Sequence, residues 1–284
     1  MQDVHFDIPL GRITALHQPG NGLKVLALHG WLDNAASFLP LAEYLPDLNL
    51  VALDLPGHGH SLHLPTGTEY SFHAAMSAVL DVADALGWSQ FCLLGHSMGA
   101  GIASLLAAAC PQRIVRLVAI EMLGALTDSP EHTATRMREA MAWQRERAPR
   151  TLRVFADIER AVQARLLASR VPGSGLDVAL LRLLVARGVR AVPGGVVWRS
   201  DPRLTQPSLT RMTPPQVDDL LAAITCPTLG VFATPAQPYL PDPERRRRLG
   251  LLANGEAAFL EGGHHLHMQQ PAAVAGLIQA FLTR

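Results

Sequence analysis

The pentapeptide Gly95-His96-Ser97-Met98-Gly99 carries the strongest chemical signal in the sequence. It has the form G-x-S-x-G, and it stands directly between a run that predicts a strand and a run that predicts a helix. Such a turn lifts a serine hydroxyl above the edge of a sheet, at a helix N-terminus whose backbone N–H groups favour a developing oxyanion. We therefore predict that Ser97 is a nucleophile, and that the backbone N–H of Met98 is one oxyanion donor.

A histidine-rich segment, Gly262-Gly263-His264-His265-Leu266-His267, follows the last predicted strand. A serine nucleophile needs a base, and in the order Ser…acid…His that base comes late in the chain. His264, directly after the glycine pair, is the predicted base, and His265 and His267 are competitors. A metal-binding tract is the other interpretation, but no cysteine or carboxylate cluster accompanies these histidines in the sequence. We expect no metal site.

The second oxyanion donor is expected in the loop after the strand predicted at Lys24–Leu28. That loop begins with His29-Gly30-Trp31, and the backbone N–H of Trp31 is the predicted donor. His29 itself is interpreted as a structural loop histidine. Asp54, at the end of the next predicted strand, is interpreted as a structural loop carboxylate.

Apolar runs alternate with helical patterns along most of the chain, which is typical of a parallel sheet covered on both faces. Strands are predicted at residues 24–28, 48–53, 91–94, 116–120, 228–232 and 257–260, and an antiparallel hairpin at 4–18. Helices are predicted at residues 35–45, 72–86, 100–109, 215–223 and 272–282. Between Met122 and Asp218 the alternation stops: 136–147, 152–169 and 176–187 are helix-like, and 192–215 is expected to be irregular. The arginine run 245–248 is expected to form a solvated helix face.

Composition excludes several classes of protein. The chain has 284 residues, 49% apolar and 17% charged, which is too apolar for intrinsic disorder. The formal net charge is zero, so we expect no nucleic-acid partner, although residues 136–211 hold 15 arginines and 6 acids. No apolar run reaches the roughly 18 residues of a membrane span, and the N-terminus lacks the features of a secretory signal. A cytoplasmic monomer or homodimer is expected.

Four segments resemble the α/β-hydrolase superfamily: HGWLDN at 29–34, DLPGHGHS at 54–61, GHSMG at 95–99 and GGHHLH at 262–267. GWLDNAASF at 30–38 and VWRSDPRL at 197–204 also look like the subgroup called serine hydrolase-like proteins. The resemblance implies an α/β fold with a mostly parallel eight-stranded sheet, and no cofactor. It implies a core at 1–121 and 219–284, with a helical cap at 122–218 inserted after the sixth strand.

The acid that completes a catalytic triad is the point at which the sequence departs from the commonest family pattern. An Asp usually follows the seventh strand, but residues 232–238 hold no carboxylate and Gln237 stands about where it would be. Some capped members place the acid after the sixth strand, where this chain has Glu121. A lone carboxylate inside an apolar run needs a partner, and His264 would be that partner. Glu121 is therefore the predicted acid; Asp242, Asp128 and no working acid remain open.

These residues predict a serine hydrolase that cleaves a small-molecule carboxylic ester, or a thioester, through an acyl-enzyme. Two alternatives remain. One is a ligand-binding protein with a hydrolase fold and weak turnover. The other is a C–C bond hydrolase or perhydrolase that uses the same triad.

Overall fold

The computed structural model describes residues 1–145, 152–168 and 176–284. Within these residues the main sheet has eight strands in the order β1-β2-β4-β3-β5-β6-β9-β10. β1 pairs with β2 and β2 with β4 in antiparallel fashion, whereas all other pairs are parallel. The strands are β1 (Gln2–Ile8), β2 (Gly11–Gln18), β3 (Lys24–Leu28), β4 (Asn49–Leu53), β5 (Phe91–His96), β6 (Ile114–Ile120), β9 (Thr228–Thr234) and β10 (Gly255–Glu261).

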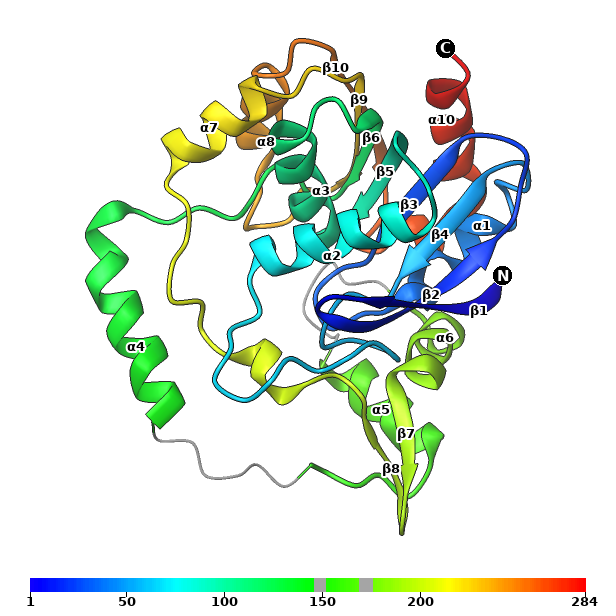
Figure 1. Cartoon of the computed structure of the whole chain (residues 1–284), viewed down its shortest axis with the longest axis vertical. Helices are drawn as coiled ribbons and strands as arrows, with labels where there is room; N and C mark the ends of the chain where they lie inside the picture. Colours follow the sequence, from blue (N-terminus) through cyan, green and yellow to red (C-terminus); the bar gives the residue numbers. More distant parts are fainter. Residues whose placement is uncertain (146–151, 169–175) are drawn as a thin grey trace.

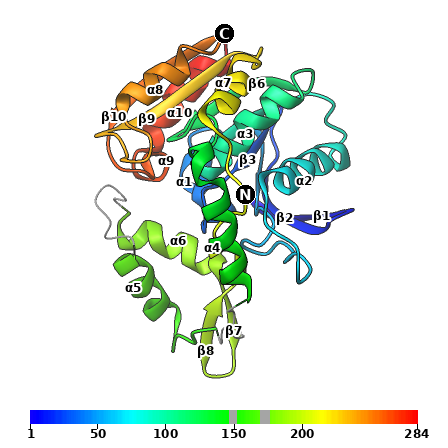
Figure 2. The same cartoon turned by 90° about the vertical axis from the view of Figure 1, so that its left-hand side faces the viewer.

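Helices cover both faces of this sheet (Figures 1 and 2). One face packs against α2 (Phe72–Ala85), α3 (Met98–Ala109) and α7 (Pro214–Ala222). The other face packs against α1 (Leu39–Ala42), α9 (Leu266–Gln269) and α10 (Pro271–Leu282). Every residue of β5 is buried, as expected for a central strand with helices on both sides. The predicted mostly parallel α/β sheet is confirmed.

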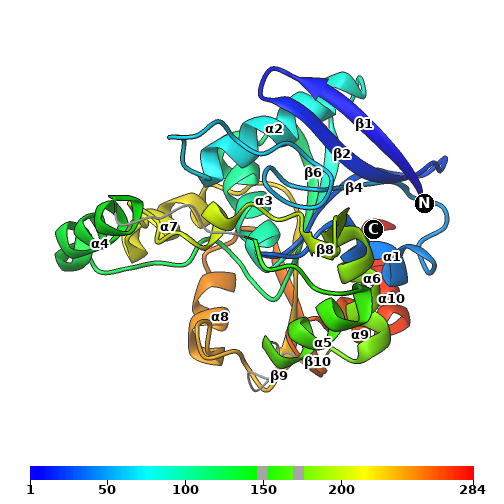
Figure 3. The ribbon, with the colours of Figure 1, turned by 90° about the horizontal axis from the view of Figure 1, so that it is seen from below.

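The described residues of 122–218, here called the 122–218 segment, lie mainly beyond the carboxyl ends of the parallel strands (Figures 1 and 3). These described residues include two 3-10 helices, η2 (Pro130–His132) and η3 (Pro202–Thr205), and end in α7. Its other elements are α4 (Thr133–Arg145), α5 (Ile158–Ala168), α6 (Val178–Gly188), β7 (Val189–Val192) and β8 (Gly195–Trp198). α5, α6 and the hairpin share a small apolar cluster that includes Phe155, Val162, Leu181, Leu184 and Val185. This cluster is separate from the two that cover the faces of the main sheet.

Polar contacts join the 122–218 segment to loops of the sheet. Arg187 of α6 lies 2.9 Å from the buried carboxylate of Asp54, just after β4. The side chain of Asn34 donates a hydrogen bond to the backbone oxygen of Leu184. Because these groups are buried, losing one partner would leave the other unpaired in a poorly solvated place. The segment is thus fixed over the sheet edge at α6.

Two sequence expectations about secondary structure differ from the structure. Residues 192–215 were expected to be irregular, but β7 and β8 form a hairpin over 189–198. The two-residue turn between them is Pro193-Gly194. Gly194 has a φ of 87°, and Gly195, the first residue of β8, has a φ of 143°, a region that favours glycine, so a Gly-rich stretch here marks a tight turn. The helix expected at 35–45 is shorter: a 3-10 helix, η1 (Ala35–Phe38), runs into α1, with Asn34 as its N-cap.

The arginine run also differs from its expected solvated face. It lies on α8 (Asp242–Leu249), where Arg245 and Arg248 are buried, while Arg246 and Arg247 are exposed. The Arg248 guanidinium donates to the backbone oxygens of Leu123 and Ala125. Backbone carbonyl groups in the loop after β6 thus accept hydrogen bonds from a side chain of a neighbouring helix. A count of charges along the sequence does not reveal such contacts.

No described helix combines the length and the hydropathy that a bilayer crossing requires.

Candidate active site

Ser97 occupies the turn between β5 and α3. Its backbone lies at φ 52° and ψ −117°, a conformation that a non-glycine residue rarely adopts. Its neighbours must be glycine, because a Cβ at Gly95 would lie 2.4 Å from the Cα of Ala100, and one at Gly99 would lie 2.0 Å from the Leu28 carbonyl oxygen. The serine N–H is fixed by a 2.8 Å bond to the Ile120 oxygen. The strained strand–turn–helix predicted from the pentapeptide is present.

Glu121 directly follows β6, the strand that neighbours β5. It is fully buried and its φ is 60°. Its two carboxylate oxygens have different partners. Oε1 accepts hydrogen bonds from the Ala233 N–H at 2.5 Å and from Arg245 at 3.3 Å. Oε2 lies 3.4 Å from Nδ1 of His264, so the carboxylate is held on one side and directed at the histidine on the other.

His264 lies in the loop after β10, and its backbone oxygen accepts a 2.8 Å hydrogen bond from Nε2 of His96. The structure thus brings Glu121 and His264 into contact, and it places Ser97 at the same edge of the sheet. Nδ1 of His264 has a second neighbour, the Tyr239 hydroxyl, at 2.8 Å. Within the described residues, no direct hydrogen bond joins Ser97 to His264.

The hydroxyl end of Tyr239 is directed inward, although 43% of the residue's surface is exposed. Burial of the hydroxyl, together with the nearby Glu121 carboxylate, raises the pKa of Tyr239. The phenol is therefore neutral at physiological pH, and it can both donate and accept a hydrogen bond.

The two predicted oxyanion donors lie on turns that leave their backbone N–H groups available. In the loop after β3, the N–H of Leu32 donates to Nε2 of His58 and the N–H of Asp33 donates to the Gly30 oxygen. No group in the described residues accepts from the backbone N–H of Trp31 between them. The same holds for Met98, the first residue of α3. The Trp31 indole, by contrast, donates to the Leu204 oxygen.

The other candidates for the acid lie elsewhere. Asp242 is the first residue of α8, and its carboxylate lies 3.5 Å from Arg245. Asp128 pairs with Arg136 and with His132, and these hydrogen bonds lower the pKa of its carboxyl. Neither carboxylate contacts His264 in the described residues. Gln237 is buried, and its backbone oxygen accepts from the N–H of Leu240.

The other residues that the sequence analysis considered bind loop backbone groups or pack against neighbouring side chains. His29 is fully buried, with Nδ1 2.7 Å from the Gly30 oxygen and Nε2 accepting from the Leu55 N–H. Asp54 accepts from the N–H groups of Ala35 and His60. His265 contacts Asp33, and His267 is buried against the ring of Phe38. His264 is therefore the histidine of the GGHHLH segment that contacts Glu121.

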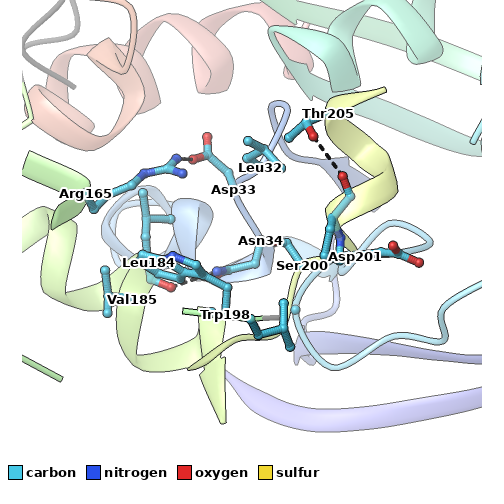
Figure 4. A pocket seen from close by; sticks show the side chains of 14 residues that line it. Leu32, Asp33, Asn34, Arg165, Leu184, Val185, Trp198, Ser200, Asp201 and Thr205 are labelled. Carbon is cyan, nitrogen blue, oxygen red and sulfur yellow. Dashed lines mark hydrogen bonds and ion pairs between the residues drawn. The ribbon is translucent and has the colours of Figure 1, made fainter. Parts of the chain in front are cut away.

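A cavity of about 230 Å³ lies between the loop after β3 and the 122–218 segment (Figure 4). Arg165 of α5 faces Asp33 across it at 2.8 Å. Its lining mixes apolar and polar side chains, among them Leu32, Asp33, Asn34, Arg165, Leu184, Val185, Trp198 and Ser200. Because Leu32 directly follows Trp31, the cavity begins one residue from a predicted oxyanion donor.

Sequence reasoning missed two residues of this site, Tyr239 and Arg245. Tyr239 lies in a Pro-rich loop and belongs to no motif, so no local signal marks it. Arg245 is hidden in a run of four arginines, of which the helical period directs Arg245 and Arg248 inward. The available signal was the spacing alone: Arg245 and Arg248 stand three residues apart, which places both on one face of a helix.

Comparisons with known proteins identify the family and the fold. Residues 25–202 match the family described as "alpha/beta hydrolase fold". The chain is 32% identical over 289 residues to a serine hydrolase-like protein of Danio rerio, covering 97% of this chain and 86% of that protein. It is 32% identical over 272 residues to a serine hydrolase-like protein of Dictyostelium discoideum, covering 91% and 74%.

A solved structure of a hypothetical protein from Pseudomonas aeruginosa PAO1 is similar over the whole length of both chains, with 39% identity and a TM-score of 0.92. The resemblance that the four sequence segments suggested is therefore confirmed by independent relatives and by the fold. The chain belongs to the alpha/beta hydrolase fold family, and its relatives include serine hydrolase-like proteins.

Proposed function

We propose that the protein hydrolyses a carboxylic ester, or a thioester, of a small molecule through an acyl-enzyme on Ser97. One observation carries the proposal: Ser97, Glu121 and His264 follow three different strands and meet at one edge of the sheet, with Glu121 Oε2 3.4 Å from His264 Nδ1. Catalytic groups of open α/β sheets gather at the carboxyl ends of the strands. The chain order Ser, Glu, His is the order of this fold's triads.

In the proposed reaction Ser97 Oγ attacks the acyl carbon while Nε2 of His264 takes its proton. His264 then gives that proton to the leaving alcohol or thiol, and water hydrolyses the acyl-enzyme by the same steps in reverse. Glu121 accepts the Nδ1–H bond and stabilises the imidazolium that forms. The N–H groups of Trp31 and Met98 bind the oxyanion of each tetrahedral intermediate.

The partners of Glu121 suit this role. Oε1 is bound by Ala233 and Arg245, so the carboxylate cannot rotate freely, and Oε2 is left for His264. The two donors on Oε1 also offset part of the cost of burying this carboxylate.

We further propose that the 122–218 segment acts as a cap and that the cavity beneath it binds part of the substrate. The cavity of about 230 Å³ is smaller than the roughly 300–1,000 Å³ that accommodates drug-sized ligands. Its mixed lining suits a short acyl or alcohol group with a polar substituent. A long fatty-acyl chain would not fit within it.

The Tyr239 hydroxyl favours a second candidate, a ligand-binding protein with weak turnover. It lies 2.8 Å from Nδ1 of His264, closer than the Glu121 carboxylate at 3.4 Å, and so competes with the acid for the imidazole. Turnover of a chromogenic acyl ester separates the two functions. A hydrolase releases product repeatedly after the first burst, whereas a binding protein stops at or below one equivalent.

Fluorophosphonate labelling tests the nucleophile directly. We expect one adduct per chain, mapped by mass spectrometry to Ser97, and none in the Ser97→Ala variant. Ser104, a buried serine on the same helix, is the matched control, and Ser104→Ala should label as the wild type does. An adduct on another residue, or no adduct on folded protein, would refute the assignment.

A further inference from the structure

Three side chains outside the proposed triad converge on one buried point. Asp33 follows β3, His96 ends β5, and His265 follows β10. They are 4%, 1% and 9% exposed, and one potential ligand atom from each lies within 4.8 Å of the other two. Nε2 of His265 is 3.0 Å from Oδ2 of Asp33, and Nδ1 of His96 is 3.9 Å from the same oxygen.

In this arrangement one ring nitrogen of His96, Nδ1, lacks a hydrogen-bond partner. Its Nε2 lies 2.8 Å from a backbone oxygen, so Nε2 carries the hydrogen and neutral Nδ1 presents a lone pair. Nδ1 is buried and has no hydrogen-bond partner, and it faces a carboxylate, which offers only further lone pairs. A cation between the two atoms would accept both lone pairs.

Gly30 leaves room for such a cation. A Cβ placed on Gly30 would lie 3.0 Å from Nδ1 of His96 and 3.1 Å from Oδ2 of Asp33. The glycine hydrogen therefore points into the space between the two ligand atoms. Zinc binds nitrogen and carboxylate oxygen at about 2.0–2.2 Å, so two ligands of a tetrahedral ion lie about 3.4 Å apart. The two separations from Asp33, 3.0 and 3.9 Å, lie on either side of that value, and all three ligand atoms lie within 4.8 Å of one another.

We propose that Asp33, His96 and His265 form a binding site for Zn²⁺. The ligand atoms would be Oδ2, Nδ1 and Nε2 respectively, with water in the fourth position; His265 would release its Nε2 proton on binding. Two imidazoles and one carboxylate suit borderline transition-metal ions, whereas Mg²⁺ and Ca²⁺ prefer oxygen ligands alone.

The surroundings of Asp33 support the proposal. Arg165 binds the other carboxylate oxygen, Oδ1, at 2.8 Å, so it fixes the carboxylate with Oδ2 directed at the two histidines (Figure 4). Asp33 also lines the cavity. The sequence argued against a metal here because no carboxylate or cysteine accompanies the GGHHLH histidines. The fold supplies a carboxylate from residue 33 and a third ligand from residue 96.

The test uses untagged, full-length protein, stripped with EDTA and desalted, because a histidine tag would bind zinc itself. Titration with ZnCl₂ in a calorimeter should show one site per chain, and Zn²⁺ should raise the melting temperature by mass action. MgCl₂ should do neither. Both readouts are independent of hydrolysis, so the Ser97→Ala variant should bind zinc as the wild type does.

Ligand variants locate the ion. His265→Gln and Asp33→Asn should each weaken zinc binding at least tenfold, with folding confirmed by circular dichroism. His264→Gln removes the neighbouring histidine that is not a proposed ligand, and it should retain the wild-type affinity. Absence of zinc binding, retention of binding in both folded ligand variants, or loss of binding in His264→Gln alone would overturn the proposal.

Discussion

The guanidinium of Arg245 lies 3.3 Å from Oε1 of Glu121, and neither side chain is exposed to solvent. Arg245 also donates to the Ala233 oxygen at 2.6 Å and lies 5.0 Å from the centre of the Phe232 ring. The buried carboxylate proposed as the triad acid is therefore neutralised by an arginine from α8. Glu121 is positioned by a tertiary contact rather than by its strand alone.

Removing this arginine should destabilise the protein strongly. Arg245→Met keeps most of the apolar volume but leaves the Glu121 carboxylate unpaired and buried. Loss of one partner of a buried ion pair costs about 3–5 kcal/mol. We expect that decrease in the free energy of unfolding measured with urea. Arg246→Met is the matched control: Arg246 is exposed, so its loss should cost about 1 kcal/mol or less. Equal effects of the two substitutions would contradict the structural role of Arg245.

Glu121→Gln should lower kcat by roughly 10³–10⁴, the scale seen when triad acids are removed, with the fold retained by circular dichroism. The amide cannot stabilise the imidazolium by charge. Asp242→Asn should lower kcat by less than about tenfold, because Asp242 contacts Arg245 and not His264. The reverse ranking, with both proteins folded, would move the acid to the loop after β9.

Tyr239→Phe should retain at least about a third of the wild-type kcat. The hydroxyl lies closer to Nδ1 of His264 than Glu121 does, 2.8 against 3.4 Å, so its removal leaves Glu121 as the partner of the imidazole. The phenyl ring preserves the packing. A kcat loss of 10³ or more in steady-state ester hydrolysis would instead make the Tyr239 hydroxyl part of the reaction.

His58 should make the protein sensitive to acid. Burial, with repulsion from His29, lowers the pKa of His58 to about 3, and its Nε2 accepts from the Leu32 N–H. Between pH 6.5 and 3 the unfolded chain binds a proton at this position that the folded chain does not. Its stability contribution is therefore present above pH 6.5 and is lost as the pH falls.

Urea unfolding at pH 7.5 and 5.0 measures this effect. When the pH is lowered from 7.5 to 5.0, the free energy of unfolding should fall by about 2 kcal/mol less in His58→Gln than in the wild type. This is the amount expected for one such proton. His5→Gln, at an exposed position, is the control and should behave as the wild type. A pH dependence unchanged by His58→Gln would show that His58 is protonated in the folded state as readily as in the unfolded one.

Much of the fold follows from local sequence. β3 has the predicted bounds, and the other strands of the sheet begin or end within a few residues of theirs, because buried parallel strands are short, near-continuous apolar runs between turns. Ser97 was assigned for a related reason. Any strand–turn–helix of this kind brings backbone atoms close to positions 95 and 99, so both must be glycine. The five residues of the motif are therefore enough to predict the turn.

The partners of Glu121 and Asp33 were decided only by the tertiary structure. Glu121 contacts His264, 143 residues later, and Arg245, 124 residues later, because β6 lies beside β9 and α8 packs where those strands end. Asp33 reaches His265, 232 residues away, by the same convergence of strand ends. Local patterns determine which segments form strands and turns. Which side chains share a poorly solvated space depends on the order of the strands in the sheet, and that order fixes the charge pairing and the ligand sets of this site.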